Sequence, residues 1–565
     1  METPEQLDAM FPKLDDAQIA RLAAFGNQRR AEPGEVLFDR GDADHGVFVV
    51  LAGSIEVESV ANGGESVIRV LLRGEFTGEV TQLSGRRSLV RCRAHEASAL
   101  LEIDRPDLRR IMQTDAELGE TFLRAFLLRR VYLIAHSVGE AVLVGSSHSG
   151  DTLRLRAFLT RNGYPHTYID VENDAGVQAV LDQFAVRVAD IPVLICDGHL
   201  VLRNPSDAEA AACFGMNAGI DEADVYDLIV VGAGPSGLAA AVYGASEGLN
   251  VLVLESTAPG GQAGASSLIE NYLGFPTGIS GQDLANRAFV QAEKFGAQIA
   301  IARAARGIKC VRPPYTVELD DGGSVQGWSL IVAAGAQYRK LDLPNVAQFE
   351  GAGIYYGATA VEAQLCSDAE VAIVGGGNSA GQAALFLSGR AKHVYILVRG
   401  AGLANTMSRY LIARIEARRE ITVKPGTEVE ALEGGTHLER VRWRDAKTGT
   451  SEMHEIQHVF LMTGANPNTA WLKGCLALDE KHFIKTGADL GLDWPASRPP
   501  YLLETSVPGI FAVGDIRSGS VKRVASAVGE GSMAVQFVHK ILAGNGSGSG
   551  TGASRAVQGD RPTKA

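Results

Sequence analysis

The chain has 565 residues, of which 46% are hydrophobic and 21% are charged, the balance of a globular protein with several domains. Its formal net charge of −13 argues against a nucleic-acid-binding protein with a basic surface. The acidic N-terminus METPEQLDAM and the lack of any run of about 18 apolar residues predict neither a signal peptide nor a transmembrane helix. We therefore expect a cytoplasmic protein that uses neither nucleic acid nor membrane as a partner.

The six cysteines form no CxxC pair and no metal-ligand spacing. In a reducing cytoplasm, isolated cysteines are typically small buried residues, so we expect free thiols and no metal site. They are Cys92, Cys196, Cys213, Cys310, Cys366 and Cys475.

Residues 1–140 predict an antiparallel jelly roll between helical segments. Apolar runs of strand length at 36–38, 47–51, 55–60 and 67–72 alternate with turns that contain Gly and Asp, a pattern typical of such folds. Residues 141–215 then predict a small α/β unit and residues 216–223 a linker. The Gly/Ser-rich residues 544–565 predict a disordered tail.

The strongest motif is a Gly-rich turn between a strand at 226–231 and a helix at 238–248. It reads Gly232-Ala233-Gly234-Pro235-Ser236-Gly237. In this dinucleotide-binding fingerprint the glycines allow a tight turn and the close approach of a pyrophosphate, whose charge the helix N-terminus attracts. The strand at 249–254 ends at Glu255, which is placed to accept hydrogen bonds from a ribose.

A second fingerprint follows a strand at 371–374. It reads Gly375-Gly376-Gly377-Asn378-Ser379-Ala380. The next strand, at 394–398, ends at Arg399, where the first site has an acid. A cation at this position suits the 2′-phosphate of NADP rather than NAD. Two dinucleotide sites in one chain indicate a flavin and a nicotinamide.

More short motifs occur in a fixed order after these turns. They are Gly260-Gly261-Gln262, Glu270-Asn271-Tyr272, Ala334-Gly335-Ala336, Thr463-Gly464-Ala465-Asn466-Pro467 and Gly509-Ile510-Phe511-Ala512-Val513-Gly514-Asp515. Over about residues 224–543 the chain resembles the bacterial low-molecular-weight thioredoxin reductases. The resemblance implies a homodimer, an FAD domain in two parts at 224–342 and 462–543, and an inserted NAD(P)H domain at 343–461.

The resemblance also implies which residues bind the cofactors. FAD would lie against Gly232, Gly234, Pro235, Ser236, Gly237, Glu255, Gly261, Gln262, Asn271, Gly335, Gly514, Asp515, Arg523 and Val524. NADPH, with NADH as the alternative, would lie against Gly375, Gly377, Asn378, Ser379, Ala380, Arg399 and Arg409. The family has a second arginine next to the first, where this chain has Gly400, and Arg409 would compensate for it.

One departure from the family decides the chemistry. Thioredoxin reductases carry a CxxC before the second fingerprint, but here Gly357 and Ala360 occupy the two redox positions. Neither residue can form a thiolate. Cys366 follows six residues later without a partner in the sequence. The relay from flavin to dithiol is therefore missing, and the flavin itself is the reacting group without a certain catalytic side chain.

The N-terminal segments at 33–38, 41–42 and 46–53 resemble cyclic-nucleotide-binding domains. In the matching phosphate cassette, Glu79 after Gly78 would bind the ribose 2′-hydroxyl, and Arg87 before Ser88 would bind the cyclic phosphate. Arg86 competes with Arg87 for this role because the spacing is short. The alternative is a domain that retains the fold without the ligand.

Residues 141–215 resemble the thioredoxin/glutaredoxin fold, with Ile191-Pro192 placed like that family's cis-proline. Residues 146–152 read SSHSGDT where a CxxC would open the first helix, so both redox cysteines are absent. His148 in this segment is a surface or helix-capping residue by this interpretation. The expected fold class is thus multidomain α+β and α/β: a β jelly roll, a small thioredoxin-like domain, and two Rossmann-like domains.

These patterns favour an FAD-dependent oxidoreductase that NADPH reduces and that the jelly roll regulates. The electron acceptor would be a ferredoxin-like protein, a quinone, oxygen or a disulfide of a partner. One alternative is a disulfide reductase that uses noncanonical cysteines such as Cys366. Another is a signalling protein with little turnover, in which the flavin or a cyclic nucleotide switches partner binding.

Overall fold

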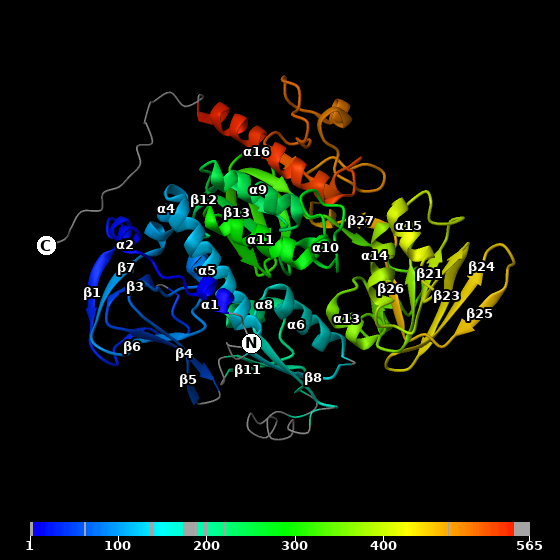
Figure 1. Ribbon diagram of the computed structural model, residues 1–565. Helices are drawn as coiled ribbons and strands as arrows, with labels where there is room; N and C mark the ends of the chain where they lie inside the picture. Colours follow the sequence, from blue (N-terminus) through cyan, green and yellow to red (C-terminus); the bar gives the residue numbers. More distant parts are fainter. Residues whose placement is uncertain are drawn as a thin grey trace.

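The computed structural model describes residues 4–43, 45–61, 64–135, 141–147, 149–172, 174, 187, 190–196, 200–217, 222–472 and 474–546. Four units can be distinguished in this part of the chain (Figure 1). We call them the N-terminal unit (4–135), the middle unit (141–217), the first Rossmann unit (222–338 and 465–546) and the second Rossmann unit (339–464). His148, residues 218–221 of the predicted linker 216–223 and residues 547–565 of the predicted tail 544–565 lie outside the described residues. Residues 544–546, which the composition predicts to be disordered, instead form the end of helix α16 (Val524–Gly546). None of the described helices combines the length and apolarity needed to cross a membrane.

The N-terminal unit contains two antiparallel sheets, as its alternating pattern predicts. One has the order β1-β7-β3 and the other the order β2-β6-β4-β5. The strands are β1 (Asn27–Ala31), β2 (Val36–Phe38), β3 (Val47–Ala52), β4 (Ile55–Ala61), β5 (Gly64–Leu71), β6 (Arg91–Ala94) and β7 (Ser98–Ile103). The helices are α1 (Pro4–Met10), α2 (Asp16–Leu22), α3 (Thr81–Ser84), α4 (Arg105–Thr114) and α5 (Ala116–Ala135).

The long helix α5 holds this unit together through aromatic packing. Phe122 and Phe126 of α5 are fully buried, and the Phe122 ring centroid lies 4.4 Å from that of Phe76. Helix α4 begins at a capped end, because the Asp104 side chain accepts a hydrogen bond from the backbone N–H of Asp107. The sheets and α5 therefore share one core.

The middle unit is a four-stranded sheet of order β11-β10-β8-β9. Its strands are β8 (Ala141–Gly145), β9 (His166–Asp170), β10 (Val193–Cys196) and β11 (Leu200–Arg203), and its helices are α6 (Gly150–Arg161) and α8 (Asp207–Cys213). Strands β8 and β9 are parallel, whereas β10 is antiparallel to β8 and β11. The Ile191–Pro192 peptide bond before β10 is cis.

Four cysteines form disulfides, contrary to the expectation of free thiols. Cys196 pairs with Cys213, and Cys310 pairs with Cys475. The paired cysteines are 17 and 165 residues apart in the sequence. Folding brings them together, and no short spacing in the sequence predicts these disulfides. Cys92 and Cys366 are free and buried, as expected.

The first Rossmann unit is built on a sheet of order β14-β13-β12-β17-β16-β15, with β28 paired to β17. The strands are β12 (Val225–Val231), β13 (Val251–Glu255), β14 (Gln298–Ile301), β15 (Ala305–Lys309), β16 (Tyr315–Leu319), β17 (Ser324–Val332) and β28 (Ile510–Ala512). The helices are α9 (Pro235–Ser246), α10 (Gly261–Gly264), α11 (Gly281–Lys294) and α16 (Val524–Gly546). Short 3-10 helices, η2 (Ala470–Leu472), η3 (Gly487–Asp493) and η4 (Gly514–Ile516), lie in the returning segment.

The second Rossmann unit has a parallel sheet of order β19-β26-β20-β21-β22 and an antiparallel sheet of order β23-β24-β25. The strands are β19 (Ile354–Tyr355), β20 (Glu370–Val374), β21 (His393–Val398), β22 (Ile421–Pro425), β23 (Thr427–Gly434), β24 (Leu438–Asp445), β25 (Ser451–His454) and β26 (His458–Leu461). The helices are α12 (Val346–Phe349), α13 (Ala360–Leu365), α14 (Asn378–Leu387) and α15 (Arg409–Glu416).

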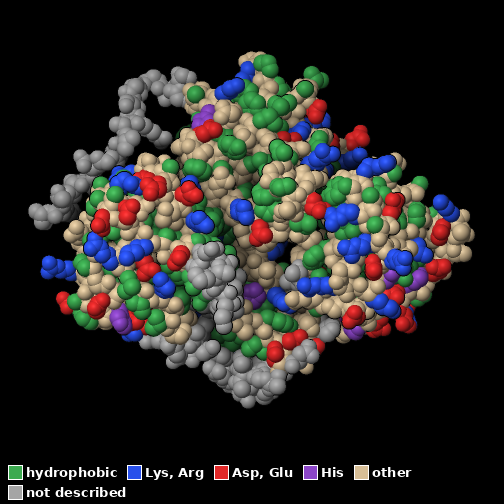
Figure 2. Space-filling model, viewed as in Figure 1, with side chains coloured by type: hydrophobic (Ala, Val, Ile, Leu, Met, Phe, Trp, Pro, Cys, Tyr) green, Lys and Arg blue, Asp and Glu red, His purple; other side chains and the backbone are tan. Residues whose placement is uncertain are grey.

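The two Rossmann units are joined by a two-stranded ribbon. Strand β18 (Ala336–Tyr338) leads out of the first unit, and β27 (Ala465–Pro467) leads back into it. A further link is the ion pair between Arg414 of α15 and Glu270, whose Nη1 and Oε2 atoms are 2.5 Å apart. The visible face of the molecule mixes acidic and basic side chains over all units (Figure 2).

The N-terminal unit packs on α11 of the first Rossmann unit. Glu293 of α11 is 3% exposed, and its Oε1 lies 3.8 Å from Nη2 of Arg86. Burial raises the pKa of Glu293 to about 7. The positive charges of Arg86, Arg109 and Arg130 oppose this rise in pKa, and the negative charge of Glu79 adds to it. The interface therefore contains a carboxyl group that titrates near neutrality.

Replacing Glu293 by Gln should change how stability depends on pH. Because the folded-state pKa lies above the ordinary 4.5, the folded protein holds this proton to higher pH than the unfolded chain. The resulting stabilisation is complete below about pH 4.5 and is lost as pH rises through about 7, by about 3 kcal/mol. Thermal unfolding between about pH 5 and pH 8 should show wild type losing stability relative to E293Q. Parallel pH profiles would contradict the assignment.

Candidate functional site

The first Gly-rich turn has the backbone that its glycines predict. Gly232 has φ +106°, and a Cβ on Gly237 would lie 1.8 Å from the Gly232 carbonyl oxygen, so neither position accepts a side chain. At Gly234 the nearest atom to an added Cβ is the Gly261 Cα, 3.9 Å away. The turn therefore leaves open space in front of the N-terminus of α9.

Glu255 at the end of β13 is buried and holds this turn in place. Its Oε2 accepts a hydrogen bond from the N–H of Ala233 at 2.8 Å. Its Oε1 accepts from the N–H of Thr257 at 3.0 Å and of Ala258 at 3.2 Å. Because a carboxylate has about four acceptor positions, the predicted bond to a ribose remains compatible with these contacts.

The returning segment of the chain completes the same site. Gly514 donates its N–H to Oε2 of Glu530 at 2.7 Å, and a Cβ on Gly514 would lie 2.7 Å from Oγ of Ser236. Burial raises the pKa of Asp515. Lys522 donates from Nζ to the Asp515 carbonyl oxygen at 2.6 Å. The sequence analysis missed Glu530, whose only signal is its position as a lone acid among small residues of α16.

The other residues predicted to bind the flavin differ in their surroundings. Gln262 donates from Nε2 to the carbonyl oxygen of Ala336, and Gly335 has φ +64° with no atom within 4 Å of an added Cβ. Asn271 lies on an exposed loop. Helix α16 begins at Val524, directly after the exposed Arg523, so the positive end of its dipole lies there.

The second Gly-rich turn is closed by the loop that follows Arg399. Gly375 has φ +147°, and an added Cβ would lie 2.3 Å from the Met462 carbonyl oxygen. Thr406 donates from Oγ1 to the Gly376 carbonyl oxygen at 2.6 Å, and Oδ1 of Asn378 accepts from the N–H of Ser408 at 2.8 Å. These contacts, which the sequence analysis missed, fix the loop over the turn.

Both predicted cations lie near this second turn. The Arg399 side chain is 88% exposed, and its Nε lies 4.0 Å from Oε1 of Glu428. Arg409 is exposed at the first position of α15, directly after Ser408. Ser379 lies beside the cavity described next, and Ala380 is buried against the core of this unit. An anion at this edge would meet two exposed positive charges.

A cavity of about 60 Å³ lies between the two Rossmann units. The first unit contributes Gln262, Ala265, Ser266, Ser267 and Tyr338, and the second contributes Tyr356, Gly357, Ala358, Ser379, Gln382, Ala383 and Met462. An added Cβ at Gly357 would lie 3.6 Å from Cβ of Ala265. The cavity therefore places Gly357, one of the two positions predicted to replace the redox cysteines, against the loop that carries Gln262.

Cys366 lies in the interior of the second Rossmann unit. It is fully buried in the core of the second Rossmann unit, and burial raises the pKa of its thiol to about 12. Ala360, the other redox position, begins α13, where Glu362 accepts a hydrogen bond from the N–H of Thr359 at 2.9 Å. Among the described residues, no group of three or more His, Cys, Asp or Glu side chains is placed to hold a metal ion.

In the predicted phosphate cassette of the N-terminal unit, Glu79 and Ser88 are buried, Gly78 is partly buried and Arg87 is exposed. Gly78 has φ +106° and Ser88 donates to the Val90 carbonyl oxygen at 2.9 Å. Arg87 is exposed and packs on Gly215, where an added Cβ would lie 2.8 Å from its Nε. Arg86, in contrast, is 13% exposed and turns toward α11. Arg86 is thus the arginine that faces the interior.

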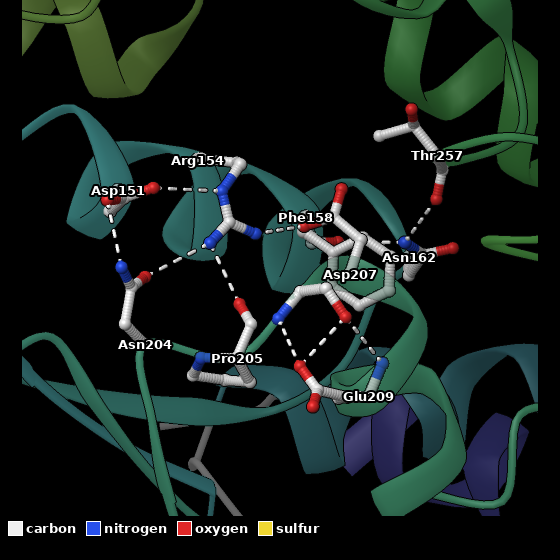
Figure 3. A network of polar contacts seen from close by, with 10 residues as sticks. Asp151, Arg154, Phe158, Asn162, Asn204, Pro205, Asp207, Glu209 and Thr257 are labelled. Atoms are coloured by element: carbon white, nitrogen blue, oxygen red, sulfur yellow. Dashed lines mark hydrogen bonds and ion pairs between the residues drawn. The ribbon is translucent and has the colours of Figure 1, made fainter.

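Helix α6 of the middle unit is fixed by a polar network (Figure 3). Arg154 donates to Oδ1 of Asp207 at 2.5 Å and to the Pro205 carbonyl oxygen at 2.8 Å. At the end of α6, Asn162 donates to the Thr257 carbonyl oxygen of the first Rossmann unit at 3.1 Å. The network ties the middle unit to the loop that follows Glu255.

Comparison with known proteins follows this geometry. Residues 226–531 match the family model of pyridine nucleotide-disulphide oxidoreductases. The chain belongs to this family. Residues 28–115 of the oxidoreductase match the model of the cyclic nucleotide-binding domain, which agrees with the two antiparallel sheets of the N-terminal unit.

Individual relatives are thioredoxin reductases. The oxidoreductase is 34% identical to thioredoxin reductase of Treponema pallidum (strain Nichols) over 309 residues, which cover 55% of this chain and 94% of the relative. It is 31% identical to thioredoxin reductase of Bacillus subtilis (strain 168) over 326 residues, 57% of this chain and 96% of the relative. The crystal structure of Lactococcus lactis thioredoxin reductase superposes with a TM-score of 0.52 at 27% identity, covering 56% and 99% of the two chains.

Alkylation should distinguish Cys366 from a catalytic cysteine. Its raised pKa makes the thiolate roughly a thousandfold rarer than in an ordinary cysteine at neutral pH, and its burial blocks access. Iodoacetamide followed by mass spectrometry should leave Cys366 unmodified in the native oxidoreductase and modify it after unfolding in urea. Rapid modification of the native protein, or loss of activity in C366S, would contradict a structural role.

Proposed function

We propose that the oxidoreductase binds FAD, is reduced by NADPH and passes electrons to an acceptor outside the chain. The observation that carries this proposal is the cavity between the two Rossmann units, which Gly357 lines in place of a redox cysteine. Glycine and alanine cannot form a disulfide, and Cys366 is buried in the core. An internal dithiol relay at this position therefore has no donor atoms.

The residues of the first Rossmann unit fit FAD. The open space at Gly234 and Gly335 suits a close approach of backbone to a dinucleotide, and the N-terminus of α9 offers free N–H groups to a pyrophosphate. When bound, FAD would supply two-electron transfer between NADPH and the acceptor. Around it, Asp515 would bind hydroxyl or phosphate groups and the N-terminus of α16 at Val524 would stabilise negative charge.

The residues of the second Rossmann unit fit NADPH. The N-terminus of α14 at Asn378 faces the loop fixed by Thr406, and Arg399 and Arg409 would bind the 2′-phosphate. NADH would lack that contact. The ribbon β18/β27, which links the two units, would be the hinge about which the second unit turns toward the first when both sites are filled.

The acceptor is proposed by chemical class: a ferredoxin-like protein, a quinone or oxygen. Reduction of a disulfide through Cys366 is disfavoured because that thiol is buried with a raised pKa. The cyclic nucleotide-binding domain would act as a sensor that biases the orientation of the Rossmann units.

We propose that the middle unit is a thioredoxin-like domain without redox activity. Its sheet order and the cis-Pro192 agree with that fold, while residues 141–149, directly before α6, contain no cysteine. Helix α6 contacts both Rossmann units: Arg156 donates to Gln364 at 3.0 Å, and Arg161 donates to the Gly261 carbonyl oxygen at 3.2 Å. This bridge would limit rotation about the ribbon.

Alanine at Gly234 should reduce flavin binding without unfolding the protein. The added methyl group meets no protein atom closer than 3.9 Å, but it would enter the space proposed for the pyrophosphate. We expect at least about tenfold weaker FAD binding, measured by fluorescence titration of the deflavinated protein. Gly402→Ala is the matched control, because no atom lies within 4 Å of its added Cβ either. Equal affinity in G234A and G402A would contradict the assignment of this space.

Steady-state turnover tests the function and the nicotinamide site together. With ferricyanide as acceptor, wild type should oxidise NADPH, and R399A should raise KM for NADPH by about tenfold with little change for NADH. Arg390→Ala removes another exposed arginine, near the opposite end of β21. It should leave KM for NADPH and KM for NADH unchanged. Absence of turnover with either nicotinamide would overturn the proposed function, and equal effects of R399A on both would overturn only the role of Arg399.

A further inference from the structure

The buried boundary between the N-terminal unit and α11 contains charges from both sides. Arg86 and Arg130 come from the N-terminal unit with side chains 13% and 15% exposed, and Glu293 comes from α11 with 4% exposed. Nη1 of Arg130 lies 3.8 Å from Oε2 of Glu79, a residue of the predicted phosphate cassette. Two parts of the chain that are over 160 residues apart thus share one ionic cluster.

Helix α11 contacts Arg86 in two ways. The Glu293 carboxylate lies 3.8 Å from its Nη2, and the Phe289 ring centroid lies 4.8 Å from its guanidinium carbon. A negative charge and an aromatic face are the two kinds of group that arginine prefers. The phosphate and base of a nucleotide are groups of the same two kinds.

The charged groups in this cluster lie close together, but several of their buried atoms have no hydrogen-bond partner. Among the described residues, both carboxylate oxygens of Glu79, Nη2 of Arg86, Nη1 of Arg130 and Oε2 of Glu293 are buried without a hydrogen-bond partner. Such groups are rare in folded proteins, and each destabilises the buried state. Donors and acceptors of the cassette are therefore available for a ligand that carries both an anionic group and hydroxyl groups.

The charge balance of the cluster is compatible with an exchange of anions. Arg86, Arg109 and Arg130 face Glu79 and Glu293, which leaves an excess of one positive charge. A cyclic phosphodiester and a carboxylate each carry one negative charge, so replacing Glu293 by a cyclic nucleotide would leave the buried charge unchanged. Binding of the phosphodiester beside a retained Glu293 would bring the net charge of the cluster to zero, but it would bury one more charge, at a desolvation cost.

We propose that Glu293 of the oxidoreductase occupies the place of a ligand phosphate beside Arg86, so that a cyclic nucleotide and α11 compete for the same arginine. Docking of the N-terminal unit on the first Rossmann unit thus excludes the ligand, and the ligand releases the docking. The inference rests on the proposed cyclic nucleotide ligand of the N-terminal unit, and it is independent of the redox chemistry.

Calorimetric titration with 3′,5′-cyclic AMP and, separately, 3′,5′-cyclic GMP tests this competition in the full-length protein at about pH 8, above the proposed titration of Glu293. E293Q should bind one of them at least tenfold more tightly than wild type. Adding R86A to E293Q should abolish that binding. Glu247→Gln is the control, because it removes a carboxylate of the same unit that contacts His539 rather than the N-terminal unit, and it should bind as wild type does.

The other possible results of the titration would overturn either the competition or the ligand class. Equal affinity of wild type and E293Q would overturn the competition and leave the cyclic nucleotide ligand intact. Absence of binding in both proteins would overturn the ligand class, and the competition with it. Hydrogen exchange provides a readout that needs no variant: saturating ligand should increase exchange at residues 281–294 of wild type, and unchanged protection of α11 in the presence of bound ligand would overturn the inference.

Discussion

The parallel pairing of β28 with β17 is the constraint on which the rest of the molecule depends. Ile510, Phe511 and Ala512 pair with Leu330, Ile331 and Val332 in the buried centre of the first sheet. Because this strand lies near the end of the chain, the whole second Rossmann unit must leave the first sheet after β17 and return before β28. The same pairing brings Gly514 and α16 against the Gly-rich turn that begins at Gly232. Without the β28–β17 pairing, the returning segment would not line the open space at Gly234, and only the residues of the Gly-rich turn and its neighbours would do so.

The two Rossmann units are connected in ways that differ in rigidity. The ribbon β18/β27 is short, and its Tyr338 lines the shared cavity together with Ser379 of the second unit. The exposed ion pair Arg414–Glu270 adds little stability, since exposed pairs contribute about 0–1 kcal/mol. Helix α6 of the middle unit packs more firmly, with Leu153 against the core of the second unit. The proposed restraint on rotation therefore lies in the middle unit more than in the direct contacts of the Rossmann units.

Much of the dinucleotide architecture could be predicted because its determinants are local. Gly232, Gly237 and Gly375 are required by backbone geometry within a few residues, and the strand, turn and helix around each are visible in the sequence. What could not be predicted depends on partners far along the chain. The disulfide Cys310–Cys475 spans 165 residues, and nothing local distinguishes the buried Arg86 from the exposed Arg87. The position of Glu293 beside Arg86 follows only from how two units pack.

The central claim is that the flavin is the only redox group in the path from NADPH to the acceptor. Anaerobic titration of the purified protein with NADPH, followed by the loss of flavin absorbance, tests it directly. Wild type should reach full reduction at about one NADPH per flavin, because each flavin accepts one electron pair. The variant with Gly357→Cys and Ala360→Cys restores a CxxC and should need about two. A requirement of about two equivalents in wild type would show a dithiol in the path and contradict the account.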